Sequence, residues 1–115
     1  MLTEIASVPV LVKNARESAE WYREKLGFEV NMQGQHWVEV KPMGSSAVLH
    51  LCEKCKEWEN DSPGGNTGIF LRSDDQAKTY RELKAKGVEF AVELTKESWG
   101  TYAVFKDPDG NQFWI

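Results

Sequence analysis

Seven side chains of this sequence have the chemistry of a small-molecule site. Three of them, Glu39, His50 and Arg72, can anchor a ligand through hydrogen bonds or ion pairs. The other four are aromatic: Trp37, Phe70, Trp99 and Trp114. Pockets for small molecules typically combine apolar rings with a few polar groups. The set therefore predicts a ligand-binding surface, although such a face could instead be a plain sheet surface partly buried in a homodimer.

Alternation along the expected strands assigns most of these residues to one sheet face. Successive side chains of a strand point to opposite faces. In WVEVK, residues 37–41, the two valines suit the face that packs on a helix, which leaves Trp37 and Glu39 on the other face. The same alternation assigns four more residues to that face: His50, Phe70, Arg72 and Trp114. Trp99 precedes the penultimate strand, where a flat ring could stack on a planar ligand or only plug the end of the sheet.

The strands that hold these residues belong to a pattern that occurs twice. VLVKN, YRE and GFEV in the first half of the chain return as IFLRS, YRE and GVEF in the second half. An internal repeat of this kind fixes the architecture, because each copy forms the same structural unit. In each half, a strand, a helix and three short strands follow one another. The sequence predicts an α+β fold of two tandem βαβββ modules, which form a curved mixed sheet with a concave cleft.

Capping residues mark the ends of both expected helices. Asn14 is the expected N-cap of the first helix, and Gly27 is its C-terminal stop. For the second helix, we expect a capping box of Ser73 with Gln76 at the start and a stop at Gly87.

Three strands are expected after each helix. They lie at 28–32, 37–41 and 47–52 in the first half and at 88–94, 101–106 and 111–115 in the second half. We interpret residues 1–115 as a single domain, with modules at about 5–53 and 67–115 and a polar connector at 54–66.

Composition and charge narrow the classes of partner. The chain has 115 residues and a formal net charge of −4, with its basic residues scattered among acidic ones. Nucleic-acid binding is disfavoured, because phosphates call for a basic patch or stripe. No apolar run has the roughly 20 residues of a membrane helix, and the N-terminus lacks the features of a signal peptide. We therefore expect a cytoplasmic protein with no membrane or nucleic-acid partner.

Cys52 and Cys55 form a C-x-x-C pair, which could be redox-active or structural. A redox pair sits at a helix N-terminus, where the helix dipole stabilises the thiolate. Here the pair lies at a strand end before a charged loop. We therefore expect reduced structural thiols.

The chain resembles the glyoxalase, bleomycin-resistance and extradiol-dioxygenase superfamily, also called vicinal oxygen chelate proteins. The resemblance covers almost the whole chain and rests on the opening VPVLVKNARESAEWYREKLGF, the repeated half and the ending WGTYAVFKDPDGNQFWI. In metal-dependent members, one residue from each of four equivalent strands holds a divalent cation. The resemblance places those positions at Ser7, His50, Gly68 and Trp114, of which only His50 is a strong ligand. We therefore expect no metal and no other cofactor.

The leading hypothesis is non-catalytic binding. Within the superfamily the chain resembles the bleomycin-binding antibiotic-resistance proteins, metal-free dimers that sequester a large cationic, aromatic drug. This resemblance implies a homodimer whose tryptophans stack on a small-molecule ligand while Glu39 and His50 anchor it. The alternative is a lyase or isomerase, in which His50 is a general base or part of an atypical metal site and Arg72 holds the substrate. A protein-interaction module without either activity is a third hypothesis.

Overall fold

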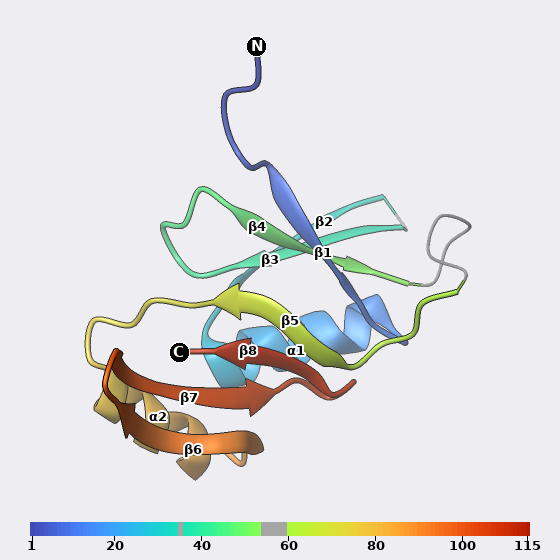
Figure 1. Ribbon diagram of the computed structural model, residues 1–115. Coiled ribbons are helices and arrows are strands. Elements are labelled where there is room, and N and C mark those ends of the chain that lie inside the picture. The colour runs from blue at the N-terminus through green and yellow to red at the C-terminus, as the bar shows by residue number, and fades with distance from the viewer. Residues whose placement is uncertain (35, 54–59) are drawn as a thin grey trace. The chain divides into compact units, whose positions relative to one another are not determined.

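The computed structural model spans residues 1–115 and describes all of them except residue 35 and residues 54–59 (Figure 1). The chain divides into unit 1, Met1–Pro63, and unit 2, Gly64–Ile115. Within the described residues, each unit contains one helix and four strands in the order β-α-β-β-β, and each has its own four-stranded sheet. The predicted α+β fold with a repeated βαβββ module is therefore confirmed.

Unit 1 has a mixed sheet in the order β1-β4-β3-β2. Its elements are β1 (Ser7–Leu11), α1 (Ala15–Leu26), β2 (Glu29–Gln33), β3 (Trp37–Lys41) and β4 (Val48–Cys52). β1 runs parallel to β4, whereas β3 is antiparallel to both β2 and β4. α1 contacts β2, β3 and β4, so it covers one face of this sheet.

Local sequence explains both ends of α1. The Asn14 side chain accepts a hydrogen bond from the Glu17 N–H at 3.0 Å, and Gly27 ends the helix at a φ of 71°. That φ lies in the left-handed region, which glycine adopts without a steric penalty. Four helix residues are buried: Ala15, Ser18, Ala19 and Tyr22. Both predicted ends of this helix are confirmed.

The core of unit 1 lies between α1 and the sheet. Val38 and Val40 of β3 are buried, as are Leu49 and Leu51 of β4. The residues that alternate with them along both strands keep part of their surface accessible. The alternation predicted for these two strands is therefore correct, because the aliphatic side chains fill the helix side of the sheet.

Unit 2 repeats this topology, with the sheet order β5-β8-β7-β6. Its elements are β5 (Gly65–Phe70), α2 (Gln76–Ala85), β6 (Phe90–Glu97), β7 (Gly100–Lys106) and β8 (Asn111–Trp114). β5 runs parallel to β8, as β1 does to β4. β5 begins at Gly65, inside the range that the sequence assigned to a connector. Neither described helix has the length and apolar character that a membrane crossing requires.

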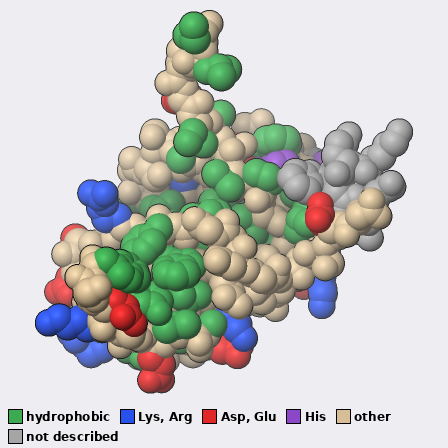
Figure 2. Space-filling model, viewed as in Figure 1, with side chains coloured by type: hydrophobic (Ala, Val, Ile, Leu, Met, Phe, Trp, Pro, Cys, Tyr) green, Lys and Arg blue, Asp and Glu red, His purple; other side chains and the backbone are tan. Residues whose placement is uncertain are grey.

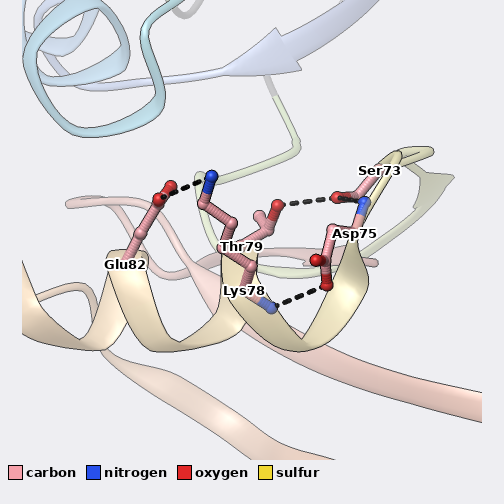
Figure 3. Close-up of polar contacts among 5 residues, drawn as sticks. All are labelled: Ser73, Asp75, Lys78, Thr79 and Glu82. Atoms are coloured by element: carbon pink, nitrogen blue, oxygen red, sulfur yellow. Dashed lines mark hydrogen bonds and ion pairs between the residues drawn. The ribbon is translucent and has the colours of Figure 1, made fainter.

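The start of α2 differs from the prediction, because Asp75 rather than Ser73 is its N-cap (Figure 3). The Asp75 carboxylate accepts a hydrogen bond from the Lys78 N–H at 3.1 Å. The Ser73 hydroxyl accepts a hydrogen bond from the Asp75 N–H and shares another with the Thr79 hydroxyl at 2.6 Å. Ser73 therefore supports the cap from outside the helix, and the predicted capping box is wrong.

Gln76 connects the start of α2 to β7 and to the end of the chain. It is the first helical residue, and its Nε2 donates hydrogen bonds to the carbonyls of Thr101 at 2.6 Å and Ile115 at 3.0 Å. The side chain that the sequence assigned to a local cap instead ties the helix to β7 and to the residue after β8.

A buried carboxylate holds the turn between β7 and β8. Asp107 accepts hydrogen bonds from the N–H groups of Asp109 and Asn111, each at 2.9 Å, and from the Asn111 side-chain amide at 2.8 Å. The Asn111 side chain in turn accepts a hydrogen bond from the Gly64 N–H at 2.9 Å. The turn therefore fixes the start of β5 beside β8.

Candidate functional site

Unit 1 brings three of the predicted residues together on the sheet face opposite α1. Trp37 and Glu39 lie on β3, and Glu39 is the cross-strand partner of His50 on β4. The Trp37 and His50 rings stack, with centroids 3.7 Å apart and planes at 19°. Trp37 is 42% exposed, so the indole is partly covered by His50 and partly open to a ligand.

The environment of His50 favours its neutral form. Partial burial lowers the pKa of His50 below its ordinary value of 6.5, while the nearby Glu39 carboxylate acts in the opposite direction. Burial is the larger effect, because desolvation penalises the charged imidazolium. Near pH 7 the imidazole is therefore neutral, and one ring nitrogen can accept a hydrogen bond or a proton.

Removing the Trp37 ring is expected to raise the pKa of His50 toward 6.5, because the stacked indole covers one face of the imidazole. NMR titration of the His50 ring protons in the native protein and in Trp37→Ala measures this change. Trp37→Phe is the matched control, since it keeps a stacking ring and is expected to keep the lowered pKa. Equal pKa values in the native and alanine proteins would contradict this explanation.

A hollow of about 480 Å³ opens beside Glu39 in unit 1. Three neighbouring strands line it, with the residues Glu29, Val30, Asn31, Glu39, Lys41 and Val48. Lys41 Nζ lies 3.7 Å from a Glu29 carboxylate oxygen, so these two charges compensate each other. Glu39 thus belongs both to the hollow and to the pair that it forms with His50.

Unit 2 brings the other aromatic residues together as a continuous series of rings. The ring centroids are 6.2 Å apart for Phe70 and Trp114, 5.0 Å for Trp114 and Tyr102, and 5.1 Å for Tyr102 and Trp99. The angles between successive ring planes are 34°, 20° and 29°. We call these four residues the aromatic ladder. Its two end residues are well exposed, Phe70 at 56% and Trp99 at 62%, so a planar ligand could extend the stack at either end.

Asn66 orients the Trp114 ring in the middle of the ladder. Its side-chain oxygen accepts hydrogen bonds from the Trp114 Nε1–H at 3.1 Å and from the Gly68 N–H at 2.9 Å. The pairing of β5 with β8 is irregular between Asn66 and Phe70, and Gly68 has a φ of 73°. Glycine adopts this φ readily, which allows a local bulge. One amide oxygen can therefore bind the strand backbone and the indole together.

Figure 2 shows hydrophobic side chains gathered over the part of unit 2 where β7 and β8 lie in Figure 1. The sequence predicted three members of the ladder, Phe70, Trp99 and Trp114, but it missed Tyr102 and the supporting Asn66. Alternation along β7 could have found Tyr102, because the next residue is a fully buried alanine. Asn66 offered no such signal, since it fell in the expected connector.

Arg72 lies beside the Phe70 end of the ladder. Both residues line a second hollow of about 480 Å³, together with Leu71, Ser73, Gln76 and Ile115. Arg72 is exposed and has no hydrogen-bond or ion-pair partner among the residues that the structure describes. Arg72 belongs to unit 2 and His50 to unit 1, so their joint action on one substrate stays a prediction.

The residues at the four positions of the family's metal site do not form a set of metal ligands. Gly68 has no side chain, and the Trp114 indole nitrogen donates its hydrogen to Asn66. Ser7 lies two residues before the β1 position that pairs with His50. No group of three or more His, Cys, Asp or Glu side chains that could hold a metal occurs in the described part of the chain. This donor set does not fit a divalent metal, which normally has three or four protein ligands.

Of the C-x-x-C pair, only Cys52 lies within the described residues. Its thiol donates a hydrogen bond to the Glu53 carbonyl at 3.5 Å. Cys55 lies outside the described residues, so the reduced structural role of the pair stays a prediction.

Comparisons with known proteins find similarity over nearly the whole chain. A family model described as Glyoxalase/Bleomycin resistance protein/Dioxygenase superfamily matches residues 4–115. The uncharacterized protein YetH of Bacillus subtilis (strain 168) is 32% identical over 118 residues, which cover 98% of this chain and 97% of that protein.

Two solved structures are similar in fold and sequence. A superfamily member from Sphaerobacter thermophilus DSM 20745 has a TM-score of 0.87 and 30% identity, covering 98% of this chain and 95% of that one. TnmS3, an antibiotic binding protein from Streptomyces sp. CB03234, has a TM-score of 0.85 and 28% identity. The match covers 98% of this chain and 93% of that chain.

Proposed function

This chain belongs to the glyoxalase/bleomycin resistance protein/dioxygenase superfamily, and from that premise we propose that it binds a small aromatic or cationic molecule and sequesters it without metal chemistry. The observation that carries the proposal is the aromatic ladder of unit 2. Similarity to TnmS3, an antibiotic binding protein, supports the same role.

The aromatic ladder has the properties of a stacking surface. Rings whose centroids are roughly 4.5–7 Å apart attract one another, by about 0.5–1.5 kcal/mol per pair beyond the area that they bury. A planar ligand on an exposed end ring gains this attraction and also removes apolar surface from water. The Asn66 hydrogen bond holds the Trp114 ring before any ligand arrives, which lowers the entropic cost of binding.

The donor chemistry of the chain supports binding rather than metal-dependent catalysis. Metal-dependent members of the superfamily need a divalent ion that polarises the substrate. Two of the positions that the resemblance assigns to its ligands carry Gly68 and Trp114 here, and Trp114 is part of the ladder. The same strand position thus contributes a stacking ring in place of a metal ligand.

Titration with riboflavin, a planar and uncharged molecule, tests aromatic binding. Stacking on a tryptophan is expected to quench riboflavin emission along a saturable curve, because excited flavin is quenched by an adjacent indole. Bleomycin, as an aromatic cation, is expected to quench the tryptophan emission of the protein. N-acetyltryptophanamide at the same absorbance is the control for optical artefacts. Flat curves with both probes would contradict the proposed function.

We propose further that the protein is a cytoplasmic homodimer. Three apolar side chains near the N-terminus, Met1, Leu2 and Ile5, are 115%, 96% and 72% exposed. Such exposure is unfavourable in water, and a second copy could cover these residues. Light scattering during size-exclusion chromatography should give twice the chain mass of 13.1 kDa, and a monomer at micromolar concentration would contradict the dimer.

A lyase or isomerase function is favoured by one feature of unit 1, the partly buried His50, whose pKa is lowered by desolvation. A neutral imidazole can remove a proton from a substrate near pH 7, and Arg72 could hold a substrate carboxylate. Elemental analysis of the purified protein tests the metal-dependent form of this function. A stoichiometric divalent metal would favour it, whereas metal-free protein that binds riboflavin would favour sequestration.

A further inference from the structure

Three polar side chains form a row across the sheet of unit 1, on the face opposite α1. Asn31 of β2 pairs with Glu39 of β3, and Glu39 pairs with His50 of β4. Neighbouring strands lie roughly 4.8 Å apart, so the row extends over roughly 10 Å. We call Asn31, Glu39 and His50 the polar row.

The polar row has hydrogen-bonding capacity that the described part of the chain does not use. None of its three side chains has a hydrogen-bond or ion-pair partner among the described residues. Glu39 and His50 are half-buried, and their polar atoms remain accessible to solvent, so a ligand can reach them. The row offers an amide oxygen, a carboxylate and an imidazole ring. The carboxylate only accepts hydrogen bonds, and the amide oxygen and one imidazole nitrogen can accept them too, so the row can bind a ligand that donates hydrogen bonds.

The charges around the hollow favour a positively charged ligand. Among its six described lining residues, Lys41 is the one basic side chain, and it lies 3.7 Å from Glu29. The Lys41 and Glu29 charges compensate each other, which leaves the Glu39 carboxylate as the uncompensated charge. The formal net charge of −4 also attracts cations toward the protein.

An aromatic ring adjoins this carboxylate. Trp37 precedes Glu39 by two residues on β3, so both side chains project from the same sheet face roughly 7 Å apart. His50 stacks on the indole, and 42% of Trp37 is exposed. An indole ring attracts cations through its π-electrons. The carboxylate and the ring therefore favour the same class of ligand.

We propose that the polar row of unit 1 binds an organic cation with N–H donors, a primary ammonium or guanidinium group, with Glu39 as its counter-ion and Trp37 as the adjoining ring. The proposal rests on the small-molecule-binding function and adds a subsite whose chemistry differs from that of the aromatic ladder. Asn31 and His50 accept the hydrogen bonds that Glu39 does not.

Benzylammonium is the probe, and benzyl alcohol is its uncharged counterpart of nearly the same shape. Benzylammonium is expected to shift the NMR signals of the His50 ring and the Trp37 indole along a saturable curve. Benzyl alcohol is expected to bind at least fivefold more weakly, because it lacks the charge that Glu39 compensates. Equal binding of the two probes would overturn the proposal.

Glu39→Gln removes the charge and keeps the shape of the side chain. It is expected to weaken benzylammonium binding at least tenfold. Glu24→Gln, on the exposed surface of α1, changes the net charge equally and is expected to change binding less than twofold. Native affinity in Glu39→Gln, or an equal loss in both variants, would overturn the proposal.

Riboflavin separates this proposal from the function of the aromatic ladder. Circular dichroism checks that Glu39→Gln is folded, and riboflavin binding by the native protein tests the ladder independently of benzylammonium. Glu39-dependent binding of benzylammonium without any binding of riboflavin would refute the ladder and leave the cation site standing. Riboflavin binding without Glu39-dependent binding of benzylammonium would refute the cation site and leave the ladder standing.

Discussion

Replacing Trp114 by alanine is expected to weaken riboflavin binding by roughly tenfold to a hundredfold. Trp114 stands between Phe70 and Tyr102, so its loss removes two ring contacts and leaves the Asn66 oxygen without its indole partner. Direct stacking of a base on an aromatic side chain is worth about 1–3 kcal/mol by alanine substitution, or roughly fivefold to 150-fold in affinity, and a loss inside this range is expected because removal of Trp114 breaks the stack that binds the ligand. Titration of the native and variant proteins with riboflavin measures the change.

Two further variants make the Trp114 result specific. Trp114→Phe keeps a ring but lacks the Nε1–H donor, and a smaller loss is expected. Trp21→Phe alters a tryptophan of α1 that stacks edge-on with Tyr22, outside the ladder, and native affinity is expected. Circular dichroism checks that each variant is folded. A folded Trp114→Ala protein with native affinity would show that the ladder is not the binding surface.

Replacing Asp107 by alanine is expected to lower the free energy of unfolding by about 3 kcal/mol or more. Asp107 is 5% exposed, and its carboxylate accepts hydrogen bonds from the N–H groups of Asp109 and Asn111 and from the Asn111 amide. Each buried donor left without a partner costs about 1–3 kcal/mol, and bonds to a charged acceptor lie at the upper end. Urea denaturation of the native and variant proteins measures the difference.

Asp74→Ala is the matched control for Asp107. Asp74 is an exposed carboxylate of unit 2 and has no hydrogen-bond or ion-pair partner within the described residues. Its replacement is expected to change stability by less than about 0.5 kcal/mol. Similar urea midpoints for the two variants would mean that the turn between β7 and β8 does not depend on the buried carboxylate.

The repeated module could be predicted because its signals are local. Asn14 and Gly27 mark the helix ends through the backbone conformations that they favour, without reference to the rest of the fold. Alternation along β3 and β4 separated aliphatic from accessible side chains for the same reason. Trp37, Glu39 and His50 were correctly expected on one face, since a strand has only two.

Tertiary contacts decided the features that the sequence did not reveal. Either Ser73 or Asp75 can cap a helix, and the sequence around them does not show that Asp75 is the cap or that Gln76 binds carbonyls distant in the chain. The sequence assigned Asn66 to a polar connector. Its role was missed because it depends on a bulge in β5 and on an indole that lies far along the chain. Alternation along β7 could indicate the face of Tyr102, but its ring contacts with Trp99 and Trp114 involve residues outside β7, which spacing within one strand does not show.

The most direct test of the account is a two-dimensional ¹H–¹⁵N NMR titration of the native protein with riboflavin, which observes the tryptophan indole N–H groups. The account expects saturable shifts of the Trp114 and Trp99 signals, because the ligand stacks on the ladder. The Trp21 signal, from α1 of unit 1, is expected to stay in place. Binding that shifts neither ladder tryptophan would contradict the claim that the aromatic ladder is the binding surface.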